Sequence, residues 1–371
     1  MFYLKKWKNK TIVWFEASNS YVVFDHFITE LIQKLHKNIP LFEIVKECRF
    51  LLKVPQRTAV QFVLDLKKLL HQQTKKTEAC LSIDDDNPKV LNVYYSKKYY
   101  QFHNIGISIL FETELLELLI HPKFKHLERE RKIKAEFFYQ LYFENDMLVF
   151  SKGSSVVGSW PKDEKHFLQG KVSMQLLADM YKKPEDEWMG IFHASAIENG
   201  KESILLLGDS GNGKSTALAL LHASGYKCLA DDFVPVDQEK NVFLFPAAIS
   251  VKKESLQTLA PFYPELKISN EYQADSKIFR YLAPKFLNYQ QKFTCKALVF
   301  IKYDAKTDFK MSSISRIEAF QQLVPDSWIL PQTKNVANFL DWFLEMPSYQ
   351  LHYSNTIKMI DHIAKLFNDE L

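Results

Sequence analysis

Clustered glycines at residues 208–213 constrain the fold more than any other feature of this chain. The sequence has only ten glycines among 371 residues, and three of them fall within these six positions. An apolar run at residues 203–207 comes before them, and a helical run at residues 217–222 follows. A buried strand, a glycine-rich turn and a helix in this order predict an α/β core. The turn and its flank are Gly208, Asp209, Ser210, Gly211, Asn212, Gly213, Lys214, Ser215 and Thr216.

This stretch matches the pattern Gly-x-x-x-x-Gly-Lys-Ser in full, which predicts a phosphate-binding loop. The glycines let the backbone curl so that its N–H groups point at phosphate oxygens, and the helix N-terminus also favours an anion. Lys214 would bring a positive charge to the β- and γ-phosphates, and the Ser215 hydroxyl would reach Mg²⁺. We therefore predict ATP and Mg²⁺ as cofactors, although GTP or pyrophosphate stays open as the donor. An ordinary glycine-rich turn is the alternative, but a chance match is about one in a hundred.

Two adjacent carboxylates follow the next predicted strand, at residues 226–230. Asp231 comes 17 positions after Lys214 (231 minus 214), and Asp232 is next to it. An acid at the end of a strand beside the loop is where a metal-binding carboxylate belongs. Two such acids allow one to hold Mg²⁺ while the other accepts a proton from a hydroxyl nucleophile. A plain strand-ending turn is the alternative.

Residues 193–236, HASAIENGKESILLLGDSGNGKSTALALLHASGYKCLADDFVPV, resemble the HPr kinase/phosphorylase superfamily, whose core is related to phosphoenolpyruvate carboxykinase. The shared features are His193, a short hairpin, the loop, an Ala/Leu-rich helix, Gly225 and the Asp-Asp pair. The resemblance implies that Asp231 is the general base and that Asp232 and Ser215 serve the metal. It also implies that His193 lies by the transferred phosphate and that Lys214 is catalytic. From the residues alone, a lone histidine is more often structural.

The sequence departs from true HPr kinases at several points. Thr216 stands where those enzymes have Glu, and residues 245–249 replace their downstream Glu-Arg-Gly segment. These departures argue against HPr as the substrate and leave reverse phosphorolysis in doubt. The chain is more similar to the broader group of HPr-kinase-related proteins. On that likeness Lys252, Lys277 and Arg280 are candidate phosphate or substrate contacts, with ordinary surface cations as the alternative.

Residues 1–71 predict a separate α+β module of winged-helix type. Strands are expected at residues 11–15 and 21–24, followed by helices near residues 27–35, 41–48 and 55–70. This order resembles a PqqD-like domain, the peptide-recognition element of pathways that modify ribosomally made peptides. Such a domain binds a leader peptide as an added strand. A structural appendage is the alternative.

The rest of the chain is divided by composition. Residues 72–89 are polar and predict a linker, and residues 90–371 would form the P-loop kinase domain. Within it we expect strands at residues 90–99, 106–111, 137–143, 147–151 and 297–301, and helices at residues 112–120 and 174–181.

Charge and cysteine content exclude several classes of protein. The net charge is +4 with no basic cluster, which argues against nucleic-acid and membrane partners. Cys48, Cys80, Cys228 and Cys295 form no CxxC pair, so we expect reduced thiols and no zinc site. No window has the 18 apolar residues of a membrane span, and no secretory stretch opens the chain. We expect a cytoplasmic protein, and a homo-oligomer is compatible with the sequence.

Together these features predict a kinase that transfers the γ-phosphate of ATP to a Ser or Thr hydroxyl of a peptide. The N-terminal module would bind that peptide, for example a ribosomally made precursor. Two alternatives remain open. One is a kinase of a small hydroxylated metabolite, and the other is a non-catalytic, nucleotide-dependent escort protein for a peptide.

Overall fold

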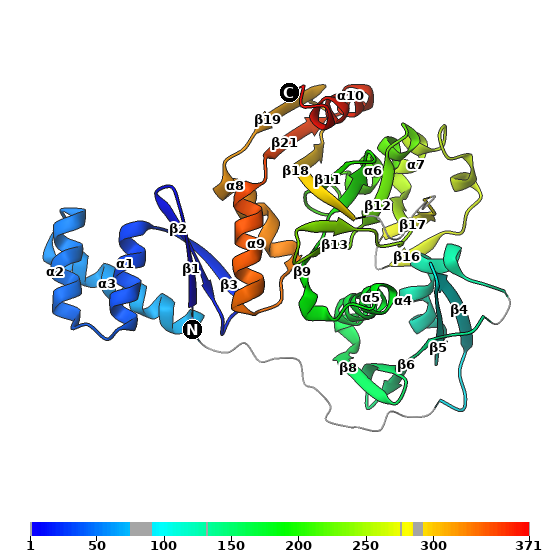
Figure 1. The fold of residues 1–371 in the computed structure, drawn as a ribbon, viewed down its shortest axis with the longest axis horizontal. Helices are drawn as coiled ribbons and strands as arrows, with labels where there is room; N and C mark the ends of the chain where they lie inside the picture. Colours follow the sequence, from blue (N-terminus) through cyan, green and yellow to red (C-terminus); the bar gives the residue numbers. More distant parts are fainter. Residues whose placement is uncertain (1, 75–90, 131–132, 275–276, 285–291, 371) are drawn as a thin grey trace. The chain divides into compact units, whose positions relative to one another are not determined.

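A computed structural model describes residues 2–74, 91–130, 133–274, 277–284 and 292–370. The chain forms two compact units, one made of Met1–Ala79 with Ile329–Glu345 and the other of Cys80–Trp328 with Met346–Leu371 (Figure 1). The sequence did not indicate that Ile329–Glu345 belongs with the N-terminal residues. The predicted linker, residues 72–89, lies almost wholly outside the described residues, and its first two residues end a helix.

The N-terminal unit opens with an antiparallel sheet in the order β1-β2-β3. Its elements are β1 (Phe2–Trp7), β2 (Lys10–Phe15), β3 (Ser20–Asp25), α1 (His26–His36), α2 (Leu41–Leu52) and α3 (Gln56–Gln73). The two expected strands and the expected helices are present. The sequence did not predict β1, because adjacent lysines interrupt its apolar pattern. The helices enclose a core of buried side chains that includes Leu31, Ile44 and Val63.

Helix α9 (Thr333–Glu345) completes this unit. Phe2 and Phe24 pack against the core of α1, α2 and α3. Side chains alternate between the two faces of a strand, so Lys5 and Tyr21 lie on the opposite face. There Lys5 forms an ion pair with Asp341 of α9, and the Tyr21 ring lies 6.1 Å from that of Phe339. The sheet is therefore covered on both faces, and α9 supplies one of the covers.

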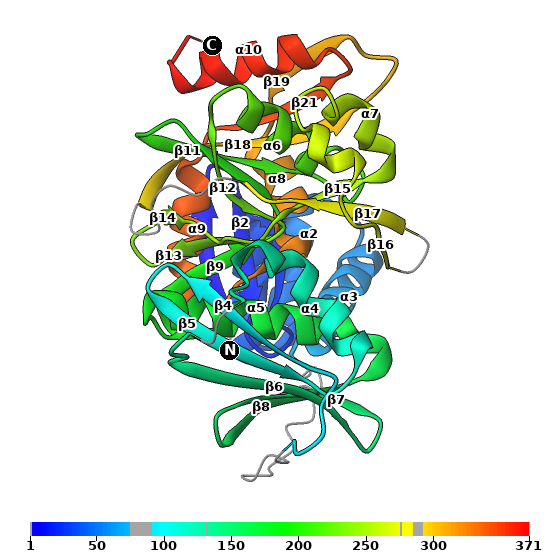
Figure 2. The ribbon, with the colours of Figure 1, turned by 90° about the vertical axis from the view of Figure 1, so that its right-hand side faces the viewer.

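The larger unit mixes helices and strands, as the α/β prediction requires. One sheet has the order β4-β5-β6-β7-β8, with α4 and α5 packed against it (Figure 2). Its elements are β4 (Ser96–Phe102), β5 (Ile105–Phe111), α4 (Glu114–Phe124), β6 (Phe137–Glu144), β7 (Met147–Lys152), β8 (Ser155–Pro161) and α5 (Lys165–Tyr181). The strands expected at residues 106–111, 137–143 and 147–151 are confirmed.

A larger sheet runs in the order β12-β10-β11-β18-β14-β13-β9-β20, and β21 joins β18 and β19. Its strands are β9 (Trp188–Phe192), β10 (Ser195–Glu198), β11 (Glu202–Leu207), β12 (Lys227–Asp231), β13 (Val234–Asp237), β14 (Asn241–Phe243), β18 (Lys292–Tyr303), β19 (Phe309–Ser313), β20 (Ser327–Trp328) and β21 (Ser348–Tyr353). Strand β18 is parallel to both β11 and β21. A smaller antiparallel sheet contains β15 (Ile249–Lys252), β16 (Tyr272–Ala274) and β17 (Lys277–Leu282).

Helix α6 (Lys214–Ala223) packs against the β10, β11 and β12 end of the larger sheet. Its neighbours are α7 (Leu256–Leu259) and α10 (Thr356–Phe367), while α8 (Arg316–Leu323) precedes β20. Leu206, Leu218 and Val299 are fully buried between these layers. Because β11 is held by β10 and β18 on its two sides, the loop between β11 and α6 is fixed at the edge of a rigid core.

Candidate active site

The loop between β11 and α6 has the backbone that its glycines predict. Gly208, Gly211 and Gly213 have φ angles of +134°, +100° and +92°, where residues with a side chain are strained. A Cβ atom at Gly208 would also meet the carbonyl oxygen of Ile301 at 2.7 Å. Gly225 closes α6 with φ +106°, as expected of a helix-ending glycine. The tight curl of the loop therefore depends on these positions being glycine.

Lys214 is the first residue of α6, and its side chain is buried inside the loop. Its ammonium donates to the backbone carbonyls of Gly208 at 2.5 Å and Asp209 at 3.4 Å. Burial lowers the pKa of Lys214 below its usual value, and the charges of Asp232 and Asp231 oppose that shift. The loop thus surrounds a positive charge that now contacts backbone carbonyls and could contact the oxygens of a bound anion instead.

Asp231 ends β12 and is almost fully buried. Its Oδ1 accepts hydrogen bonds from the hydroxyls of Ser195 at 2.6 Å and Ser215 at 3.1 Å, and its Oδ2 accepts one from the Ser250 backbone N–H at 3.1 Å. Burial, followed by the charge of Asp232, raises the pKa of Asp231 to about 7, while the three hydrogen bonds oppose the rise. Asp231 therefore ties the predicted metal-binding serine to the core.

Ser195 and Ser250 were not predicted as site residues. The sequence does place Ser195 two positions after His193, but only the pairing of β10 with β12 puts Ser195 directly opposite Asp231. Ser250 reaches the same carboxylate from β15, which belongs to another sheet. Neither contact has a local signal in the sequence.

Asp232 differs from Asp231 in backbone conformation, exposure and contacts. It has φ +65°, a conformation that aspartate tolerates better than most residues, and its side chain is 41% exposed. Its Oδ1 lies 3.7 Å from Nδ1 of His193, whose own side chain is 38% exposed. The His193 backbone N–H donates to the Asp326 carbonyl at 3.0 Å, which fixes the turn after β9. Asp231 therefore faces Ser195 and Ser215, whereas Asp232 faces the partly exposed His193.

Two cavities lie against the loop. The first, which we call the loop cavity, has a volume of about 120 Å³, and His193, Lys214, Ser215 and Asp232 are among its lining residues. The second, the outer cavity, has a volume of about 520 Å³ and extends toward Ile278, Tyr303 and Tyr353. Its size falls within the range of small-molecule and cofactor sites. The loop cavity and the outer cavity share the lining residues Ser210, Gly211, Gly213, Thr216, Lys252 and Ser255.

The predicted cations have different positions. Lys252 lines both cavities, and its ammonium lies 3.4 Å from the Ser210 hydroxyl. Arg280 instead donates to the carbonyl of Leu266 and, at 2.9 Å, to Glu271, and it lines neither cavity. Lys277 begins β17, but its side chain falls outside the described part of the chain. Of the described side chains in this predicted set, Lys252 is the one that reaches the loop.

The residues present fit a nucleotide-bound Mg²⁺. Within the described residues, no group of three or more His, Cys, Asp or Glu side chains could hold a metal by itself. Mg²⁺ in kinase sites, however, needs only one or two carboxylates besides phosphate oxygens and water. Ser215 and Asp231, 3.1 Å apart, supply the hydroxyl and carboxylate oxygens that such an ion prefers.

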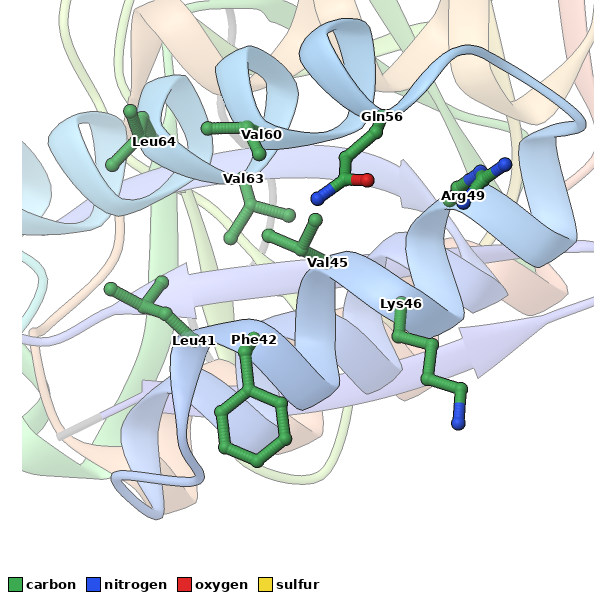
Figure 3. A pocket seen from close by; sticks show the side chains of 9 residues that line it. All are labelled: Leu41, Phe42, Val45, Lys46, Arg49, Gln56, Val60, Val63 and Leu64. Carbon is green, nitrogen blue, oxygen red and sulfur yellow. The ribbon is translucent and has the colours of Figure 1, made fainter.

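The N-terminal unit has its own candidate surface. A groove of about 480 Å³ lies between α2 and α3, lined by apolar side chains with Lys46 and Arg49 among them (Figure 3). Phe42 at its rim is 71% exposed. In addition, β3 pairs with β2 on one side, and its other edge has no strand partner among the described residues.

Comparison with models of known protein families finds no match, and neither does comparison with curated proteins. The resemblance to HPr-kinase-related proteins therefore stays a prediction.

The cysteines Cys48, Cys228 and Cys295 are free and buried, while Cys80 lies outside the described residues. Among the helices that the structure describes, none combines the length and apolarity that a bilayer span requires.

Proposed function

We propose that this protein is a kinase that transfers the γ-phosphate of ATP to a hydroxyl of a peptide, with Ser or Thr as the acceptor. The observation that carries the proposal is the buried ammonium of Lys214 inside a loop of positive-φ glycines, next to the contact between Ser215 and Asp231. A protein has little reason to bury this charge against its own carbonyls unless the loop receives an anion.

We assign the two acids in the reverse order from that implied by the family resemblance. Asp231 is buried and contacts Ser215, which lines the loop cavity, so Asp231 is suited to hold the metal-binding serine in place. Asp232 lines that cavity and faces His193, so it is suited to accept the acceptor's proton. His193 would orient the Asp232 carboxylate.

The chemistry then depends mainly on positioning and charge. Backbone N–H groups of the loop and Lys214 hold the phosphates, and Lys252 adds a second positive charge at the loop. Ser215 would contact a bound Mg²⁺, and that ion would supply positive charge against the phosphates. Asp232 takes the proton of the hydroxyl that attacks.

The first experiment mixes the protein with radiolabelled ATP and either a library of Ser/Thr peptides or a set of small hydroxylated metabolites. We expect label on peptides. Label on metabolites alone would favour the metabolite kinase, and intact ATP binding with no transfer to either would favour the escort protein.

Lys214→Ala should abolish transfer and weaken ATP binding without lowering the melting temperature. Unchanged ATP affinity in that folded variant would contradict the site.

Paired variants test the acids. Asp232→Asn should remove transfer and keep Mg²⁺-dependent ATP binding, whereas Asp231→Asn should weaken that binding. If the two results are exchanged, the roles follow the family resemblance instead.

For the N-terminal unit we propose that a peptide adds to the open edge of β3. Neighbouring residues of an antiparallel strand direct their N–H groups to opposite sides, so one of Val22 and Val23 points to β2 and the other to the open edge. Of Val22→Pro and Val23→Pro, one should therefore destabilise the unit. The other should stay folded and lose peptide affinity, measured by fluorescence anisotropy. Full affinity in the stable variant would exclude strand addition.

A further inference from the structure

A third cavity in the larger unit lies beside the loop cavity. We call it the aromatic cavity; its volume is about 350 Å³. Its apolar walls come from β8, α5, β9, β20 and the turn between β12 and β13. His193 and Asp232 line one part of it, and the same two residues line the loop cavity. The apolar lining residues are Trp160, Phe167, Met174, Ile191, Phe233 and Trp328.

Some of the side chains that line this cavity are buried and others are exposed. Trp160, Met174 and Ile191 are almost fully buried, whereas Phe167 is 45% exposed and Trp328 is 37% exposed. Pairing of β9 with β20 sets Trp328 directly opposite Ile191. Large aromatic side chains exposed together around a concave site are typical of ligand binding rather than of ordinary surface.

The charges around the aromatic cavity argue against a second phosphate site. Lys171 is neutralised by Glu185, 2.6 Å away. The remaining carboxylates in the lining are Asp232 and Asp326, and the other titratable groups are His166 and His193. An anion would therefore meet the carboxylates of Asp326 and Asp232, the latter beside His193, whereas a neutral apolar group would meet aromatic walls.

We propose that the aromatic cavity is the acceptor subsite, and that the acceptor carries an aromatic or large aliphatic group next to its reactive hydroxyl. This inference rests on the proposed kinase function. The apolar group would fill the cavity and so place the hydroxyl at Asp232 and His193. The hydroxyl oxygen forms a bond to the γ-phosphorus, its proton goes to Asp232, and the bond from the γ-phosphorus to the β,γ-bridging oxygen breaks. ADP leaves with that electron pair.

The test compares two probes with the same hydroxyl, N-acetyl-Phe-Ser-amide and N-acetyl-Gly-Ser-amide, in transfer from radiolabelled ATP. Full burial of a phenylalanine side chain should favour the first probe in kcat/KM by about 10- to 100-fold. Equal rates on both probes would overturn the proposal.

Gly170 allows the cavity to be filled without disturbing the backbone. It lies within α5 and lines the cavity, and a Cβ atom there would meet nothing within 4 Å. Gly170→Leu should therefore project into the cavity, and replacing a glycine inside a helix should not reduce stability. We expect Gly170→Leu to bring the ratio of kcat/KM for the Phe-Ser probe to that for the Gly-Ser probe close to one, with ATP affinity unchanged. Gly170→Ala adds only one methyl group and should lower the preference much less. A preference that survives Gly170→Leu would overturn the subsite.

A second readout separates this inference from the kinase proposal. Trp160 and Trp328 line the cavity, so binding of the Phe-Ser probe should change the tryptophan fluorescence. If no transfer occurs but Gly170→Leu abolishes a fluorescence change seen in the wild type, the kinase proposal fails and the cavity remains a binding site for apolar groups. If the wild type shows neither transfer nor a fluorescence change, the subsite is excluded.

Discussion

Replacing Ser195 with alanine tests how Asp231 is held. Ser195 is fully buried in β10, and its hydroxyl donates to the Asp231 carboxylate at 2.6 Å. Ser203→Ala is a matched control, because Ser203 is also fully buried, in neighbouring β11, and donates at 3.1 Å to the backbone carbonyl of Thr294. Both changes remove one buried hydroxyl, but only Ser195 bonds a group that can carry charge.

The expected cost follows from that difference. A hydrogen bond to a charged group contributes about 1.5–3 kcal/mol, and one between neutral groups about 0.5–1.5 kcal/mol. The pKa of Asp231 is raised to about 7, so its carboxyl is mostly ionised at pH 8 and mostly protonated at pH 6. Ser195→Ala should therefore lower the free energy of unfolding by about 2 kcal/mol at pH 8 and about 1 kcal/mol at pH 6. Ser203→Ala should lower it by about 1 kcal/mol at both pH values.

The direction of the pH effect has a clear origin. The pKa of Asp231 is higher in the folded protein than its ordinary value of 3.8, so the wild type loses stability as pH rises from about 4 to 7. The Ser195 hydroxyl offsets part of that loss by favouring the ionised form. Guanidinium unfolding of both variants at the two pH values measures the effect. Equal losses for Ser195→Ala at pH 6 and pH 8 would refute a charge-assisted bond.

Three further predictions concern other parts of the fold. Burial lowers the pKa of His126 to about 4 from an ordinary 6.5, so acidification from pH 7 to 4 should lower the free energy of unfolding by about 3 kcal/mol. His126→Gln should remove that part of the pH dependence, as measured by denaturant titration. Gly208→Ala should weaken ATP binding about tenfold or more in calorimetry, because its Cβ would meet the Ile301 carbonyl oxygen. The control is Gly200→Ala, which also has a positive φ but open space around it and should leave ATP affinity unchanged. Phe339→Ala should destabilise the N-terminal unit by about 3–5 kcal/mol and expose it to proteolysis, since Phe339 is fully buried. Protection equal to that of the wild type would contradict its place in that unit.

The sequence predicts local features of the site well because their causes are local. A glycine needed at positive φ, a lysine directly after it and a strand ending in two acids all leave a signal within a few residues. The different environments of Asp231 and Asp232 have no such signal, because they depend on which strands flank β12. The order of the acid roles in the sequence analysis came from the family resemblance, and the paired Asn variants test it against the order that we propose.

Strand register explains which predicted cation reaches the loop. In the β15–β17 pair, Val251 lies opposite Arg280 and Lys252 lies opposite Phe279. Side chains of residues paired across two strands share a face, and successive residues alternate, so Lys252 and Arg280 must lie on opposite faces. The sequence shows two basic residues in two β-prone runs, but it does not show how the runs are aligned. A shift of β17 by one residue would place Arg280 on the same face as Lys252.

The place of α9 has a consequence for synthesis. The ribosome makes the chain from its N-terminus, so residues 1–79 are complete 250 positions before Ile329 is added (329 minus 79). At about 5–20 residues per second, that delay is roughly 12–50 s. During this time the face of the β1–β3 sheet that carries Tyr21 waits without its helical cover. The first part of the protein to be translated is therefore among the last to finish folding, and a fragment that ends before α9 is an unfinished module.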